Sequence, residues 1–437
     1  MNIQHSKFPV QYSIFSAIML AVLAIGFCAF AHSGELSIKD NGETLTVLDG
    51  ENVVLKYNIA TLPSPDPEKP FYQRSGHIHP LCTPNGHVVT GDMCSDHLHQ
   101  HAIWFAWTSS QYDGRKVDFW NSAAQQGRIE HAEVLDKEPD EGPRDGEGDF
   151  KIRMPRANKN EARFSIRLNH IDLTGKEPKT VINEVWDVTV KAQDDVYIVD
   201  LTSTQTCTTD KPLVIKKYHY GAMGLRSPMA WNAPHGGFLT SDGKKRENGN
   251  HTRPDWVDSF GPVENEDGKD TVAGVTVMQH PSNFRYPQPV RLHPKFSYFC
   301  FAPMVLGDFA IEPGEEYVSR FQYVVHDGPL DKKQTLALWR EFSRGEIVFK
   351  IGIAKDGKLT LNGAPVNKEG LKRQVWKRLG GAIKDGNASS DVTAEIAADE
   401  EAPFQHVSEV MSIFVGVDQL PSEFGKVKIK VRSSKED

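Results

Sequence analysis

The chain has 437 residues, a formal net charge of −8, 39% hydrophobic residues and 25% charged residues. This composition is that of an ordinary folded protein, so it excludes global disorder, collagen-like rods and coiled-coil rods. The length suggests two or three domains. The mild acidity argues against nucleic-acid binding, which normally requires a basic face.

The N-terminal region contains the one stretch of sequence that is apolar enough to cross a bilayer, so a multi-span membrane protein is excluded. This stretch, residues 14–31, follows a polar start with Lys7 and ends in small residues. The pattern predicts a secretory signal over residues 1–33 and export to the periplasm or cell envelope. The alternative is a signal that stays uncleaved and anchors the chain.

Two of the cysteines that remain after export bracket a turn-rich loop. They are Cys82 and Cys94, and an oxidising compartment would allow them to pair. The alternatives are therefore a disulfide and two buried free thiols, because spacing alone does not show whether the two Cα atoms approach each other.

Residues 34–328 consist of short alternating runs that are separated by turn dipeptides. Asn41-Gly42 and Asp49-Gly50 are strong hairpin signals and delimit the first three strands. Longer strand candidates follow at 162–173, 180–192, 195–207, 270–280 and 317–328. The pattern predicts a mainly β fold with one large antiparallel β-sandwich.

The pattern changes after residue 328. Residues 329–346 predict a helical linker, and residues 347–437 predict a small α+β domain with a hairpin around Asp356-Gly357. In the helix that follows this hairpin, Leu371, Val375 and Leu379 share one face. A strand at 392–399, a second helix and a final strand at 426–433 complete the domain. The second helix is predicted to bury one stripe of side chains, Phe404, Val407, Met411 and Phe414.

The C-terminal domain resembles the periplasmic domain of the ExbD/TolR biopolymer-transport proteins over residues 347–433. The matching stretches are "DGKLTLNGAPV" (356–366) and "AEIAADEEAPFQHVSEVM" (394–411). The resemblance implies a module for docking an envelope partner or for self-association. It does not imply a transport motor, because residues 329–350 are too charged to span a membrane.

The strongest functional signal is histidine: seven of the 17 histidines fall between residues 77 and 131. His77 and His79 alternate, as do His97, His99 and His101. Alternate residues of a strand share a face, so these imidazoles are predicted to project together.

Imidazoles and carboxylates exchange protons near neutral pH, and tryptophan rings offer flat apolar faces to a pyranose. The segment therefore predicts a carbohydrate-active site, with elimination, epimerisation and hydrolysis all open as reactions. The candidate catalytic residues are His97, His99, His79 and Glu184. The candidate substrate-binding residues are His77, His101, Trp104, Trp120, His280 and Arg285.

Two other interpretations stay open. Imidazoles spaced as His97, His99 and His101 also suit a zinc, copper or iron ion, with His79, His280 or Glu184 as a possible further ligand. The protein would then be a metal-dependent enzyme. Alternatively, it is a non-catalytic envelope adaptor whose sandwich only binds glycan.

The sandwich region also resembles the bacterial family known as PmoA-like, over residues 45–328. The resemblance lies in "SGHIHPLCTPNGHVVT" (75–90), "SDHLHQHAIWFAW" (95–107), "GRKVDFWN" (114–121) and the stretches 280–294 and 312–328, with Asp96, His97 and His99 as the hallmark. Many members continue with His-Arg-Gly where this chain has Gln100-His101-Ala102. The resemblance implies a sandwich similar to the galactose-mutarotase supersandwich. It does not imply a methane monooxygenase, since that subunit is an integral membrane protein.

Overall fold

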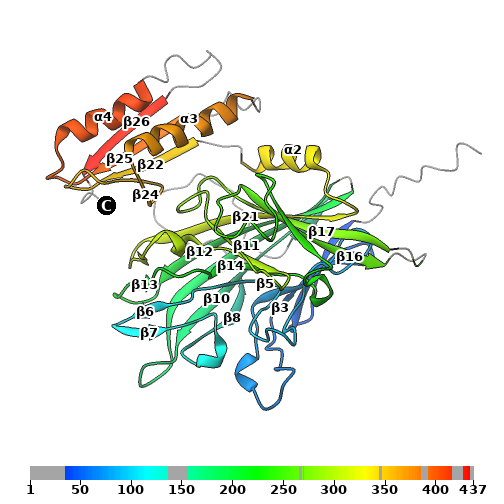
Figure 1. Cartoon of the computed structure of the whole chain (residues 1–437). Helices are drawn as coiled ribbons and strands as arrows, with labels where there is room; N and C mark the ends of the chain where they lie inside the picture. The colour runs from blue at the N-terminus through cyan, green and yellow to red at the C-terminus, as the bar shows by residue number, and fades with distance from the viewer. Residues whose placement is uncertain are drawn as a thin grey trace, which may run out of the picture.

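The chain forms a β-rich domain and a smaller α+β lobe beside it, as the computed structural model shows in Figure 1. The structure describes residues 35–135, 156–158, 160–193, 195–264, 268, 270–343, 347–384, 392–415 and 427–433. The predicted signal segment lies outside these residues and stays a prediction. Among the described helices, none combines the length and the apolarity that crossing a membrane requires.

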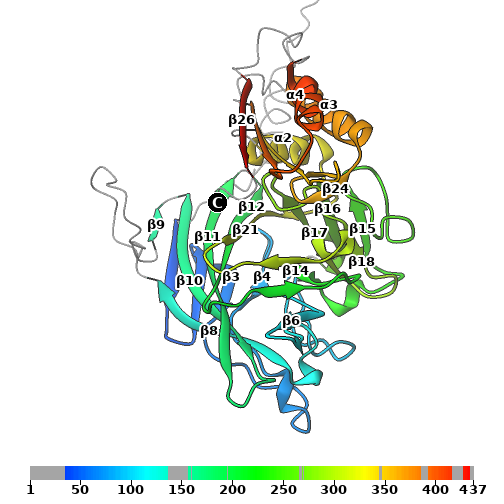
Figure 2. The same ribbon diagram turned by 90° about the vertical axis from the view of Figure 1, so that its left-hand side faces the viewer.

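Two large antiparallel sheets make up most of the β-rich domain (Figure 2). The first sheet has the order β1 (Leu36–Asp40), β2 (Thr44–Asp49), β3 (Asn52–Asn58), β4 (His77–Leu81), β5 (Ile103–Ala106), β14 (Ala222–Arg226), β19 (Tyr298–Phe301) and β18 (Val290–Leu292). The second has the order β15 (Gly237–Thr240), β16 (Trp256–Glu264), β17 (Asp270–Gln279), β21 (Glu316–Asp327), β12 (Val196–Cys207), β11 (Lys179–Gln193), β10 (Glu161–Asp172) and β8 (Gly127–Leu135), with β9 (Arg156–Asn158) paired to β10.

A smaller antiparallel sheet and short 3-10 helices complete this domain. The sheet has the order β20 (Phe309–Ile311), β13 (Leu213–Ile215), β6 (Ser110–Tyr112) and β7 (Arg115–Val117). The described loops contain the 3-10 helices η1 (Pro70–Tyr72), η2 (Ser122–Ala124), η3 (Met229–Trp231) and η4 (Pro303–Leu306).

The hydrophobic core lies between the two large sheets, since one buried cluster joins Ile103 of the first sheet to Leu168 of the second. Strand β11 shows how the sequence produces this arrangement: every second residue from Glu184 to Val190 is buried, as alternation along a strand requires. The predicted turns also form, with Gly42 at φ 79° and Gly50 at φ 61°. The prediction of a mainly β, antiparallel sandwich is confirmed.

Helix α2 (Lys332–Phe342), which was predicted as a linker, packs against the second sheet. Asp331 caps its N-terminus by accepting hydrogen bonds from the backbone of Lys333 and Gln334. Leu338 packs with Ile198 and Val324 of the sheet. The next residues along these strands, Val199 and Val325, belong to the core on the other face. The helix therefore covers the outer face of the second sheet.

The C-terminal lobe is the predicted small α+β domain. Its sheet has the order β24 (Ala364–Val366), β23 (Leu359–Leu361), β22 (Ile347–Ile353), β25 (Val392–Ala398) and β26 (Val427–Ser433), and the last three strands are parallel. Helices α3 (Lys368–Lys384) and α4 (Phe404–Val415) pack with this sheet, and Leu371, Val375 and Leu379 are buried as predicted.

The predicted stripe of α4 is partly wrong. Phe404, the first residue of the helix, is 79% exposed, and Met411 is only partly buried. The buried face instead follows Val407, Val410 and Phe414, which are spaced by three and four residues.

The four described cysteines are free thiols, so the alternative of a Cys82–Cys94 disulfide is not realised. Cys82 forms an isolated β-bridge with Val88, whereas the Cys94 sulfur packs against Gly91. Burial raises the pKa of the Cys82 thiol to about 11, which makes it unreactive near neutral pH.

Candidate functional site

The histidine-rich segment folds as a loop between residues 92 and 101, here called the histidine loop. Its ends are joined by a β-bridge between Asp92 and His101 and by a hydrogen bond of 3.0 Å from Met93 N to Gln100 O. At its tip, the backbone N–H of His97 donates to the Cys94 carbonyl at 2.8 Å. The prediction that His97, His99 and His101 project from one face of a strand is therefore wrong, because the chain turns between them.

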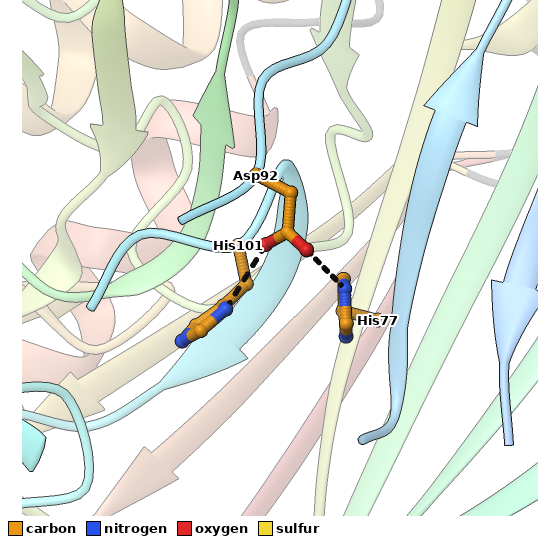
Figure 3. Close-up of side chains that lie close together, drawn as sticks. All are labelled: His77, Asp92 and His101. Carbon is orange, nitrogen blue, oxygen red and sulfur yellow. Dashed lines mark hydrogen bonds and ion pairs between the residues drawn. The ribbon is translucent and has the colours of Figure 1, made fainter. Parts of the chain in front are cut away.

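The base of the loop contains a buried triad formed by His77, Asp92 and His101 (Figure 3). His77 lies on β4, and its Nε2 is 3.0 Å from Asp92 Oδ2. His101 Nδ1 is 3.1 Å from Asp92 Oδ1. The carboxylate thus accepts one hydrogen bond from each ring, and the second nitrogen of each ring points away from it (Figure 3).

Burial and charge set the protonation states of this triad. Burial alone would raise the pKa of Asp92, but its interaction with His77 and the hydrogen bonds from both rings outweigh this and hold the pKa well below its usual range. Burial lowers the pKa of His101 to about 3 despite the nearby carboxylate. At neutral pH an ionised Asp92 therefore faces a neutral His101.

His79 lies two residues after His77 on β4 and interacts with Thr90. The Thr90 hydroxyl oxygen accepts the backbone N–H of Leu81 and lies 3.0 Å from His79 Nδ1. Because a hydroxyl has one hydrogen and two lone pairs, Thr90 can form this hydrogen bond with His79 in either tautomer of the neutral ring. Burial also lowers the pKa of His79.

The tip of the histidine loop forms a second, partly exposed group, here called the surface cluster: Asp96, His97, His99 and His293. The His97 ring centroid is 5.5 Å from that of His99 and 5.9 Å from that of His293. His97 Nδ1 is 3.7 Å from Asp96 Oδ1, and the two side chains are 24% and 16% exposed. The cluster lies where β14 ends and β19 begins, at one end of the first sheet.

Asp96 is fixed by two side chains beneath the cluster. Arg226, which is fully buried, donates from Nη2 to both Asp96 oxygens at 2.9 and 2.8 Å. Asn232 donates to Asp96 Oδ2 at 2.8 Å. Partial burial acts to raise the pKa of Asp96, but Asn232 and Arg226 outweigh this effect, so the pKa is below its usual value.

The three imidazoles of the surface cluster are neutral at neutral pH. Burial lowers the pKa of His97, and the Arg226 charge adds to this effect while Asp96 opposes it. Burial lowers the pKa of His99 and of His293 to about 4 each. Neutral imidazoles can accept protons, so the cluster has the chemistry of a general base.

Aromatic rings border the surface cluster. Phe296 lies 4.5 Å from the His97 ring centroid, Tyr298 lies 5.1 Å from that of His293, and Tyr72 lies 6.5 Å from that of His99. The Nδ1 atom of His293 accepts the backbone N–H of Phe296 at 2.9 Å. The neutral ring therefore carries its hydrogen on Nε2 and can donate from that atom.

One protein-family model matches most of the β-rich domain. The model described as "Family of unknown function (DUF6807)" matches residues 44–340. The chain belongs to this family. The matched DUF6807 segment contains the buried triad and the surface cluster, and it ends within helix α2, before the C-terminal lobe.

The DUF6807 chain also shows distant similarity to solved structures. One is a GH36 alpha-galactosidase, AgaA, from Geobacillus stearothermophilus in complex with raffinose, with 11% identity, a TM-score of 0.34 and coverage of 83% of this chain and 50% of that chain. Another is the heparan sulfate lyase HepC from Pedobacter heparinus, with 9% identity, a TM-score of 0.29 and coverage of 76% and 42%. The chain thus spans half the length of these structures or less. The comparison with curated proteins finds no match.

Glu184, predicted as catalytic, is fully buried in the DUF6807 core. Its Oε2 is 2.7 Å from His170 Nε2, and its Oε1 accepts hydrogen bonds from Trp186 at 2.7 Å, Ser203 at 2.6 Å and Gln205 at 3.2 Å. These contacts satisfy the carboxylate inside the sandwich. The prediction of a catalytic role is wrong for this conformation, because the face of β11 that carries Glu184 points into the core.

Trp104 and Trp120, predicted as a sugar platform, are also core residues. Their exposed fractions are 0% and 2%, and their ring centroids lie 4.6 Å apart. Neither ring can stack on a ligand in this conformation, so this prediction is corrected. The aromatic rings that do border the surface cluster are those of Phe296, Tyr298 and Tyr72.

His280 and Arg285, predicted to bind substrate, contact other parts of the protein. His280 interacts with Ser282 and lies 5.2 Å, between ring centroids, from Phe342 of α2. Arg285 is 5% exposed and donates to four backbone carbonyls, those of Pro303, Gly307, Asp308 and Gly363. Because Gly363 belongs to the C-terminal lobe, Arg285 joins the two parts of the chain and does not form a binding loop.

The structure therefore divides four of the predicted histidines into two groups. It places His97 and His99 in the surface cluster, and it places His77 and His101 in the buried triad. Asp92, Arg226 and His293 were not predicted. His293 stands in a His-Pro dipeptide before Phe296, but no sequence pattern connects it or Arg226 to the histidine loop.

Proposed function

We propose that this protein is an exported carbohydrate-active protein that binds a glycan at the surface cluster and processes it by acid–base chemistry. The observation that carries the proposal is the environment of His97, a neutral, partly exposed imidazole beside a fixed carboxylate. Elimination, epimerisation and hydrolysis all require such a proton acceptor near the sugar.

His97 is the candidate general base. When it takes up a proton, the Asp96 carboxylate at 3.7 Å stabilises the resulting imidazolium. Arg226 keeps Asp96 ionised and in place, so the carboxylate acts without moving. His99 and His293 remain neutral alongside and can bind sugar hydroxyls.

Two donors complete the proposed chemistry. The Nε2–H of neutral His293 can donate to a sugar oxygen. Burial raises the pKa of Tyr298, so its phenol stays protonated at neutral pH and can donate a hydrogen bond. The partly buried rings of Phe296 and Tyr72 take over the stacking role that was predicted for the tryptophans.

The non-catalytic alternative is an envelope adaptor in which the same cluster binds glycan and the C-terminal lobe docks a partner or a second copy. It draws support from the resemblance of the lobe to ExbD/TolR periplasmic domains. The metal-dependent alternative draws its support from the buried triad, which can hold a metal ion, and not from the predicted set of His97, His99 and His101.

The test is a thermal-shift screen of the full chain against a panel of neutral and uronate-containing oligosaccharides, followed by product analysis. We expect binding that His97→Ala and His99→Ala weaken about tenfold, which corresponds to about 1.4 kcal/mol. His280→Ala is the matched control, since His280 contacts α2. Binding without any product favours the adaptor. If the His97→Ala and His280→Ala variants behave alike, the site is wrong.

A further inference from the structure

We propose that His77, Asp92 and His101 bind one divalent transition-metal ion, and that this ion holds the base of the histidine loop against β4. The site uses other residues than the glycan-binding cluster, so the ion can bind whether or not a sugar does. The ion would also fix His97 and His99 for glycan binding, and this part of the inference rests on the proposed function.

The donor set fits such an ion. Two imidazoles and one carboxylate are the ligands that zinc and iron(II) accept, and copper also binds imidazole well. The same three side chains would not suit calcium or magnesium, which prefer ligand sets made of oxygen atoms.

The distances are close to those of a coordinated ion. Asp92 Oδ2 lies 3.0 Å from His77 Nε2, Asp92 Oδ1 lies 3.1 Å from His101 Nδ1, and one ligand atom from each residue lies within 4.8 Å of the others. Bonds of about 2.0 to 2.2 Å from one ion to its ligands place neighbouring ligand atoms roughly 3 to 3.5 Å apart. Binding the ion requires a small inward movement of the two rings and transfer of each ring hydrogen from the nitrogen that faces Asp92 to the other nitrogen of the same ring.

The backbone positions the three ligands independently of their own hydrogen bonds. Asp92 and His101 face each other across a β-bridge, and Ala102 N donates to Gly91 O at 3.0 Å beside it. His77 comes from β4, whose residue Ile78 pairs with Ile103 of β5, two residues after His101. The ion would therefore join an early strand to both ends of the loop.

The three ligands are largely hidden from water, although the buried Arg74 guanidinium adds a positive charge that acts on His101 and Asp92. The side chains of His77, Asp92 and His101 are only 0%, 9% and 2% exposed. A charged carboxylate and two imidazoles that are hidden from water gain more from a cation than exposed ones do. The Asn58 amide donates to the His79 carbonyl at 3.1 Å and lies 3.3 Å from His77 Nε2, which limits rotation of that ring.

Calorimetric titration of the chelator-stripped full chain with Zn²⁺ alone tests the site, with elemental analysis as the second readout. We expect one equivalent of bound zinc, a higher unfolding temperature and slower hydrogen exchange in residues 93–100. His101→Ala and Asp92→Asn should lose stoichiometric binding, whereas His97→Ala should keep it as the matched control.

The results of this titration either support the metal site or overturn it. Wild-type protein that binds no zinc, iron(II) or copper overturns the inference even if the variants fail to fold. Zinc that is lost in His97→Ala and kept in His101→Ala also overturns it, because the ion would then lie at the surface cluster. Protein that binds glycan but no metal refutes only this inference, and protein that binds metal but no glycan refutes only the proposed function.

Discussion

The ion pair between Arg226 and Asp96 gives the most direct prediction about the surface cluster. Arg226→Met keeps the approximate length of the side chain and removes the guanidinium that contacts both Asp96 oxygens. The carboxylate then retains Asn232 as its hydrogen-bond donor but loses its charged partner. Breaking a buried ion pair by removing one partner typically costs about 3 to 5 kcal/mol.

We expect a cost near the lower limit, about 3 kcal/mol in the free energy of unfolding, because Asp96 is 16% exposed and water compensates part of the loss. The double variant Arg226→Met with Asp96→Asn leaves no unpaired charge and should recover about half of this cost. The two single variants and the double variant form a cycle whose coupling energy should be about 1 to 3 kcal/mol.

Urea unfolding at neutral pH measures all four proteins of this cycle. The matched control is Arg128→Met, because Arg128 pairs with Glu130 at 3.0 Å on the surface, with side chains 51% and 39% exposed. This exposed pair should contribute less than about 1 kcal/mol. The reasoning is refuted if Arg226→Met costs no more than Arg128→Met, or if the double variant is as unstable as the sum of the two single variants.

Three further predictions concern pH, the core and the contact between the two parts. The pKa values of His99 and His293 lie near 4 in the folded protein and near 6.5 in the unfolded chain, so the unfolded state binds more protons between these values and acidification destabilises the fold. Urea unfolding should therefore show stability falling from pH 6.5 toward pH 4, and less steeply in His293→Asn. Glu184→Ala should lower the free energy of unfolding by about 3 to 5 kcal/mol, because it leaves buried donors without an acceptor. Arg285→Ala should increase hydrogen exchange in β23 and β24, because it removes a hydrogen bond to the Gly363 carbonyl beside them.

Each of these three has a result that would contradict it. For the pH effect, it is an equal acid sensitivity of wild type and His293→Asn. For the core carboxylate, it is a Glu184→Ala variant whose free energy of unfolding equals that of the wild type. For Arg285, it is unchanged exchange in β23 and β24 together with a change in saccharide binding.

The fold was predictable from sequence wherever local patterns determine structure. Alternation along β11 and the turn at Asn41-Gly42 depend only on neighbouring residues, and both formed as expected. The buried stripe of α4 was harder to predict. An apolar residue at the first position of a helix, such as Phe404, matches the helical spacing of apolar residues even when it has no partner to pack against. Burial there depends on the sheet beneath the helix, which the period does not encode.

The site was predictable only in part, and the reason lies in the backbone of the histidine loop. Alternating histidines indicate one face only if the segment is a strand, but Met93 and Ala102 at the two ends of the loop adopt φ values of 43° and 55°. Positive φ is uncommon for residues other than glycine, so no sequence rule anticipates it here. These conformations turn His97 away from His101, and the same turn brings Asp92 to His101.

The partners that give each group its chemistry come from distant parts of the chain. Arg226 ends β14, which is the neighbour of β5, and His293 follows β18, the edge strand that β14 and β19 separate from β5. A strand order that brings residue 96 to residues 226 and 293 is a property of the whole sandwich. Histidine density therefore located the loop correctly, whereas the division of labour between a buried triad and a surface cluster follows from the tertiary fold alone.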